Sequence, residues 1–121
     1  MTQWDIRLPW VKPPLSLNDT EHWAPRARKV KEIRRTTMLL AKRARIPHLE
    51  KCEVRLLWLV SNRRKRDRGN MQATMKPAVD GLVDAGVIED DAWWIVTREE
   101  NAIMLVEKGK EGLYLQVLGD P

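Results

Sequence analysis

The stretch Glu53-Val-Arg-Leu-Leu-Trp-Leu-Val60 and the segment from Asn70 to Gly86, joined by a basic loop, decide how this chain folds. The first stretch is apolar toward its C-terminal end, which is typical of a strand in the middle of a sheet. After the loop, Asn70 is suited to cap a helix and Gly86 to end one. Apolar residues recur between them at helical spacing, at Met75, Ala78, Val79 and Leu82.

Two features of this expected helix bear on its packing. Pro77 belongs in a first turn, so either the regular helix begins near Thr74 or the chain kinks at the proline. Small residues recur on one face, at Pro77, Gly81 and Ala85, which indicates close packing against a sheet. Lys76, Asp80 and Asp84 form a polar stripe, each four residues from the next.

Before this unit, apolar and polar residues alternate over Trp4–Trp10, which predicts a strand. The proline-rich segment 12–19 is expected to be a loop. Pro25–Arg45 carries a helical apolar stripe. Three further strands are expected, at Ala92–Thr97, Ala102–Val106 and Leu113–Leu118. The order β-α-β-α-β-β-β predicts an α+β fold, a mixed β-sheet with two helices packed on one face, with residues 1–121 as a single domain.

Trp93 and Trp94 fall on opposite faces of one expected strand. A core position is the expectation for this pair, with a dimer interface or a nucleobase as the alternative contact for one ring.

Charge is distributed very unevenly along the chain. Residues 1–76 hold 19 Lys and Arg against 7 Asp and Glu, whereas residues 77–121 hold 3 against 10. Between Ala24 and Arg45 there are nine Lys or Arg and a single acid, Glu32. A basic half attracts polyanions through counterion release, so we expect this helix to contact nucleic acid. Acids in such a protein either face away from the ligand or hold a cation between themselves and it.

The composition also indicates the cellular compartment. Cys52 is the single cysteine, which gives neither a disulfide framework nor a zinc cluster and fits a reducing cytoplasm. No run of eighteen apolar residues and no secretory leader is visible, so we expect a cytoplasmic protein without membrane contact.

Acidic residues surround the basic loop in a pattern suited to metal chemistry. Asp67 follows a strand, Asp80 lies on a helix, and Asp90 and Asp91 precede the next strand. Because neighbouring elements usually lie together, we expect these acids to converge at one end of the sheet. Carboxylate oxygens are the ligands of Mg²⁺, which activates water and neutralises a reacting phosphate. Lys76 would stabilise the transition state or hold Asp80 in place. Caps and solvated turns are the structural alternative for these acids.

Two stretches stand out for their fixed spacings, Arg63-Arg-Lys-Arg-Asp-Arg-Gly-Asn-Met71 and Lys76-Pro-Ala-Val-Asp-Gly-Leu-Val-Asp-Ala-Gly-Val-Ile-Glu-Asp-Asp91, and they are preceded by Leu8–Trp10, Pro14–Asn18 and His22–Trp23. In these residues the chain resembles the RusA family of Holliday-junction resolvases. The resemblance implies a homodimeric fold that binds four-way DNA junctions and, with Mg²⁺ or Mn²⁺ and no organic cofactor, makes paired symmetric nicks. Members of this family are common in phages and prophages, which would place the protein in a host cytoplasm.

The resemblance also implies roles for individual residues. Asp67, Lys76, Asp80 and Asp91 would be catalytic, and Asp67, Asp80, Asp90 and Asp91 would hold the metal. The family's second carboxylate is Gly69 here, so Asp80 is the expected substitute; Asp90, water or a backbone carbonyl are alternatives. Phosphate contacts are expected from the loop and the basic helix, at Arg63, Arg64, Lys65, Arg66, Arg68, Asn70, Arg28, Lys31 and Arg35. The competing hypothesis is a DNA-binding protein that lost the metal site at Gly69.

Overall fold

A computed structural model describes residues 1–20 and 22–121. Its elements in chain order are β1 (Thr2–Leu8), α1 (Trp23–Arg43), β2 (Cys52–Val60), the 3₁₀ turn η1 (Arg68–Met71), α2 (Gln72–Asp84), β3 (Val96–Leu105) and β4 (Gly112–Gly119). The helix predicted after the basic loop is present, and Pro77 lies inside it, preceded by the 3₁₀ turn. Gly86 follows this helix with a φ of 79°, the left-handed conformation that commonly ends a helix at glycine.

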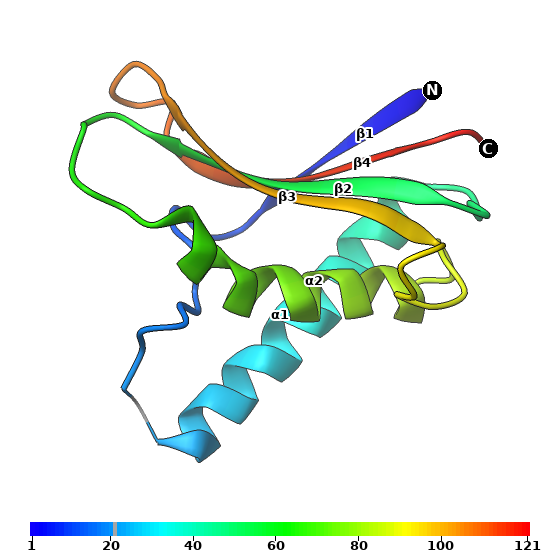
Figure 1. The fold of residues 1–121 in the computed structure, drawn as a ribbon, viewed down its shortest axis with the longest axis horizontal. Coiled ribbons are helices and arrows are strands. Elements are labelled where there is room, and N and C mark those ends of the chain that lie inside the picture. Colours follow the sequence, from blue (N-terminus) through cyan, green and yellow to red (C-terminus); the bar gives the residue numbers. More distant parts are fainter. Residues whose placement is uncertain (21) are drawn as a thin grey trace.

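The four strands form one mixed sheet in the order β1-β4-β2-β3. β4 is antiparallel to both of its neighbours, whereas β2 and β3 are parallel. Both helices cover the same face of this sheet (Figure 1). The predicted α+β class, with a mixed sheet and two helices on one face, is therefore confirmed.

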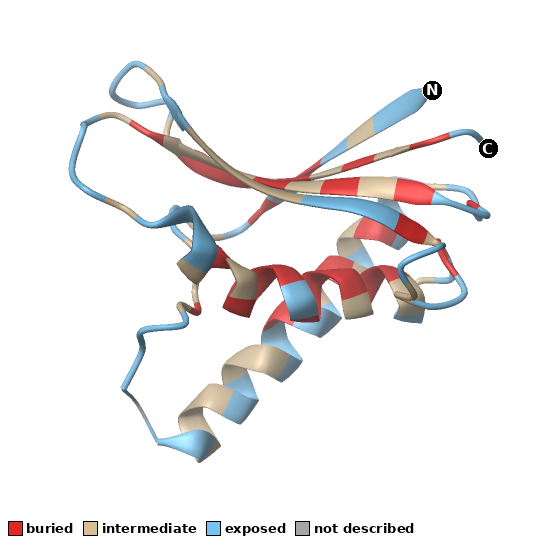
Figure 2. Ribbon diagram, in the orientation of Figure 1, coloured by how far each residue is buried: buried red, intermediate tan, exposed pale blue. Residues whose placement is uncertain are grey.

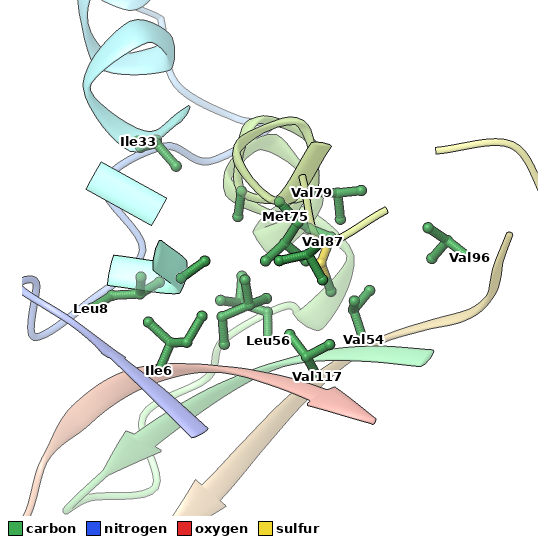
Figure 3. Packing of buried hydrophobic residues seen from close by; sticks show 14 of the residues in the cluster. Ile6, Leu8, Ile33, Val54, Leu56, Met75, Val79, Val87, Val96 and Val117 are labelled. Atoms are coloured by element: carbon green, nitrogen blue, oxygen red, sulfur yellow. The ribbon is translucent and has the colours of Figure 1, made fainter. Parts of the chain in front are cut away.

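The core lies between the sheet and the two helices. Buried and less buried residues alternate along the central strands (Figure 2), and the buried ones include Val54 and Leu56 of β2 and Leu115 and Val117 of β4. Val54, Leu56 and Val117 lie between the layers together with Met75 and Val79 of α2 (Figure 3). The period of two in the strands and the helical period in α2 thus supply the two sides of one core.

The structure corrects the prediction for residues 92–106. The expected strands at 92–97 and 102–106 are one strand, β3, and the residues before Val96 form a turn in which the amides of Ile95 and Val96 both bond to the Ala92 carbonyl, at 2.9 Å. Trp93 and Trp94 lie in this turn, 80% and 57% exposed, so their expected core position is wrong. β3 continues through the polar residues 98–101, which an edge strand tolerates because one side is open to solvent.

Helix α2 packs against α1 through its small residues. A Cβ on Gly81 would lie 2.6 Å from the carbonyl oxygen of Arg34 and 2.8 Å from Cβ of Thr37, so only glycine permits this approach. The stripe of small residues was predicted to pack against a sheet; at Gly81 its partner is α1. The same two helices are joined by the bidentate ion pair of Arg34 with Asp84, at 2.5 and 2.9 Å.

Among residues 1–20 and 22–121, no helix combines the length and apolar character needed to cross a bilayer. The thiol of Cys52 is buried, and burial raises its pKa to about 11, which leaves it protonated at neutral pH.

Candidate functional site

The side chain of Lys76 stands between two carboxylates. Its Nζ lies 3.0 Å from Oδ1 of Asp80, one helical turn along α2, and also donates a hydrogen bond to Oδ2 of Asp91 in the loop before β3. Asp90 supports this arrangement, because its Oδ1 accepts the backbone amide of Asp91 at 2.8 Å. We call Lys76, Asp80 and Asp91 the lysine cluster; it faces solvent, with side-chain exposures of 59%, 26% and 35%.

The contacts in this cluster stabilise its charged form. The hydrogen bond to Asp91, and then the one to Asp80, raise the pKa of Lys76 above its ordinary value of 10.5. The hydrogen bond from Lys76 lowers the pKa of Asp91 below 3.8, against the opposing effect of partial burial. At neutral pH Lys76 is therefore a cation and Asp91 an anion, and the cluster offers a carboxylate pair with a fixed ammonium group between its members.

Asp84, the third member of the polar stripe, has a different partner. Its carboxylate is held by Arg34, whose hydrogen bond lowers the pKa of Asp84. Of the polar stripe, Lys76 and Asp80 thus belong to the lysine cluster, whereas Asp84 joins α2 to α1 through Arg34.

Asp67 lies outside the lysine cluster. It precedes η1, where its Oδ1 accepts the backbone amide of Gly69 at 2.9 Å. A Cβ at position 69 would approach this same oxygen to 3.2 Å, a tight contact that requires a small shift of the carboxylate. Gly69 therefore leaves room for Asp67 to cap the turn that begins α2.

The topology explains why the acids do not all meet. β2 and β3 are parallel, so the chain must return along the sheet after β2 before β3 can begin, and α2 makes this return. The loop that carries Asp67 lies at one end of α2, and the loop that carries Asp91 lies at the other (Figure 1). The predicted convergence at one end of the sheet is therefore wrong for Asp67, whereas Asp80, Asp90 and Asp91 do come together beside Lys76.

These positions decide which residues fit a divalent metal. Across residues 1–20 and 22–121, no three His, Cys, Asp or Glu side chains are grouped so that they could hold an ion. Mg²⁺ is commonly bound by only one or two carboxylates, with water and substrate phosphate completing its shell. Asp80 and Asp91 match that pattern in number and residue type, and each has a second carboxylate oxygen beside the one that accepts from Nζ of Lys76.

The basic loop between β2 and η1 is braced from within. The guanidinium of Arg66 donates to the carbonyls of Asn62 and Arg64 and to Oδ1 of Asn62, at 2.9–3.1 Å. It also lies over the ring of Trp58, 5.1 Å from the centroid. Arg66 therefore shapes the loop, and its neighbours Arg63, Arg64, Lys65 and Arg68 are exposed.

On α1, the predicted DNA-contact residues Arg28, Lys31 and Arg35 are all exposed. The opposite face of the helix buries Ile33, Thr37 and Ala41. The helix is thus amphipathic, as predicted, and its basic side is open to a ligand.

A cavity of about 560 Å³ adjoins Asp67. Its lining includes Lys12, Lys29 and Trp58, which were not predicted as site residues. The loop 12–19 forms one wall because the buried Thr74 hydroxyl accepts the amide of Leu15 at 3.1 Å and donates to its carbonyl at 2.8 Å. A polar threonine on the otherwise apolar face of α2 was the one sequence signal for this contact.

Comparison with known proteins adds little to this geometry. No protein-family model matches the chain. The chain is similar to an uncharacterized protein of Xylella fastidiosa (strain Temecula1), with 32% identity over 90 residues. The match covers 70% of this chain and 59% of that relative, so the chain spans less than two thirds of the relative's length.

Proposed function

We propose that this protein is a metal-dependent endodeoxyribonuclease that resolves four-way DNA junctions. The observation that carries the proposal is the lysine cluster, in which Lys76, Asp80 and Asp91 meet at an exposed site. These residues belong to the segment that resembles the RusA family, and carboxylates and a lysine are residue types suited to metal-dependent phosphodiester hydrolysis. A resident Mg²⁺ held by Asp80 and Asp91 would supply water activation and charge neutralisation at the scissile phosphate.

The chain's own residues would act on the substrate electrostatically. Lys76 is a fixed cation with more than half of its side chain exposed, so it can donate to a phosphate oxygen as negative charge develops there. Its bonds to two carboxylates hold the ammonium group in position before the substrate arrives. Asp90, through the amide of Asp91, orients the loop that presents the second carboxylate.

Binding to branched DNA would come from the basic half of the chain. The exposed cations of α1 and of the loop 63–68 offer a surface for phosphates, and this contact is expected to weaken steeply with salt. We further propose a homodimer, because paired nicks in opposing strands of a junction call for two sites related by a two-fold axis.

One observation favours a second candidate, a protein that binds branched DNA without cutting it. Gly69 stands where the resembled family has a carboxylate, and among the described residues no three ligand side chains are grouped around a metal position. Such a protein would keep the basic surface and its salt dependence.

Incubation of the protein with an end-labelled four-way junction distinguishes these functions. The nuclease produces paired symmetric nicks in Mg²⁺ or Mn²⁺ and none in EDTA, with a linear duplex of the same sequence left uncut. A non-cutting protein retards the junction in a gel under both conditions and yields no product. Failure to bind or cut the junction at low salt would contradict both proposals.

A further inference from the structure

The cavity beside Asp67 has the size of a small-molecule site. Its volume of about 560 Å³ lies within the range of roughly 300–1,000 Å³ that is usual for ligand pockets. It is formed where the loop 12–19 meets β2 and the segment 65–71, and it does not include the lysine cluster.

The walls of this cavity are held in place by buried or backbone hydrogen bonds. Thr74, fully buried on α2, makes two bonds to the backbone of Leu15. The amide of Leu17 bonds to the carbonyl of Asn70 at 3.1 Å. The loop is thus attached to α2 and η1 at two successive points, and a ligand would meet a site that is already formed.

The cavity offers a stacking surface. Trp58 lines it, and the guanidinium of Arg66 lies over the Trp58 ring. Because its three hydrogen bonds to the loop fix the guanidinium plane, Arg66 presents a flat, rigid cation. Unstacked nucleobases bind to aromatic rings and to arginine planes of this kind.

The polar lining divides into two kinds of groups. Lys12, Lys29 and Lys65 supply cations for a phosphate. Asn70 and the carboxylates of Asp19 and Asp67 also line the cavity, and they can accept hydrogen bonds from the amino groups of a base. A ligand with both a phosphate and a base edge matches this combination better than a phosphate alone, which the carboxylates would repel.

We propose that this cavity binds one unpaired nucleotide, with its base against Trp58 and Arg66 and its phosphate beside the lysines. The inference rests on the proposed DNA-binding function and gives it a substrate feature, an extrahelical nucleotide at the branch. A free mononucleotide offers the same chemistry, so the experiment must separate the two sources.

Photocrosslinking locates the nucleotide directly. The protein is irradiated in EDTA with a four-way junction that carries one unpaired 5-iododeoxyuridine, and with the same junction fully paired. Trp58 is the single tryptophan of the tryptic peptide Leu56–Arg63, so mass spectrometry assigns its adduct without ambiguity. We expect the adduct on Trp58 with the unpaired nucleotide, and a yield about tenfold lower with the paired junction because a stacked base is not available.

Charge-matched variants test the phosphate side of the cavity. K12A/K65A removes two lining cations and is expected to lower the Trp58 adduct about tenfold at moderate salt. K108A/K110A removes the same charge from the turn before β4, which does not line the cavity, and should leave the yield unchanged. Equal yields from the two double variants would overturn the proposal.

The remaining outcomes distinguish a free mononucleotide from a nucleotide within DNA, and the cavity proposal from the nuclease proposal. Loss of the adduct in excess dTMP, but not in excess abasic DNA, would assign the cavity to free nucleotides. Adducts only on Trp23, Trp93 or Trp94 would overturn the cavity proposal and leave junction cleavage untouched. An adduct on Trp58 in a protein that makes no nicks would support the cavity and contradict the nuclease.

Discussion

The ammonium group of Lys76 and the carboxylate of Asp91 form a hydrogen-bonded ion pair between α2 and the loop before β3. This pair brings a loop residue to a helix residue fifteen positions earlier, and Asp80 completes the arrangement from the next helical turn. The lysine cluster therefore depends on how the loop closes against the helix as well as on helical spacing.

The pH dependence of folding follows from this pair. The folded pKa of Asp91 is depressed, so its contribution is present above pH 3.8 and is lost as the pH falls through the folded value. The folded pKa of Lys76 is raised, so its contribution is present below pH 10.5 and is lost as the pH rises through the folded value. Urea unfolding of Asp91→Asn should show a loss of about 0.2–1 kcal/mol at pH 7, the range for exposed pairs, and a smaller loss at pH 2. An equal loss at both values would contradict the ion pair.

The pair of Arg34 and Asp84 should stabilise the contact between the helices. Its geometry is bidentate, at 2.5 and 2.9 Å, and Asp84 is more protected from solvent than Arg34. A double-mutant cycle with Arg34→Ala and Asp84→Ala, read by thermal or chemical unfolding, is expected to give a favourable coupling between the two side chains. Additive effects of the two substitutions would show that the ion pair is not formed.

Gly81→Ala should destabilise the protein although alanine favours helices. At an open helix position this change stabilises by up to about 1 kcal/mol. Here the new Cβ would lie 2.6 Å from a backbone oxygen of α1, and overpacking of this kind costs about 1–3 kcal/mol. Gly112→Ala is the control, because the nearest atom to its Cβ is 3.4 Å away at the end of the flexible Arg7 side chain. A Gly81→Ala protein as stable as the wild type would disprove the close approach of the helices.

Gly69→Asp tests whether a carboxylate is missing beside Asp67. The substitution adds a second acid there at the cost of a small shift, since its Cβ starts 3.2 Å from Oδ1 of Asp67. Because the proposed ion is held by Asp80 and Asp91 at the other end of α2, we expect isothermal titration with Mn²⁺ to detect an additional binding event that the wild type lacks. Gly69→Asn has nearly the same size without the charge and should show no gain. Equal gains in both variants would attribute the effect to backbone conformation and contradict the missing-ligand account.

The sequence was sufficient for those parts of the fold that periodicity determines. The helical stripe that includes Met75 and Val79 and the apolar C-terminal end of residues 53–60 correctly predicted two elements, α2 and β2, that face one core. The strand prediction failed for residues 92–101 because hydrophobic periodicity does not reveal a turn. Trp93 and Trp94 are residue types typical of a strand, yet the hydrogen bonds to the Ala92 carbonyl form a turn that contains them. The polar centre of β3 was misjudged because the sequence does not reveal which strand lies at an edge.

The candidate site was predictable only where its residues are local. The spacing of Lys76 and Asp80 placed them on one helical face, and the structure adds their contact at 3.0 Å. The position of Asp67 relative to Asp91 depends on strand direction, because a parallel pair puts the two loops at opposite ends of α2. The cavity was not predicted, since it requires Lys12 and Trp58, 46 positions apart in the chain, to line the same space.

The rate of junction nicking in Asp91→Asn and Asp84→Asn, measured side by side in Mg²⁺, tests the central claim most directly. Both changes remove one carboxylate charge and conserve size, but Asp91 belongs to the lysine cluster and Asp84 is paired with Arg34. The account predicts a loss of about a hundredfold or more for Asp91→Asn, the scale of a removed transition-state contact, and less than about threefold for Asp84→Asn in folded protein. Equal rates for the two variants would contradict it.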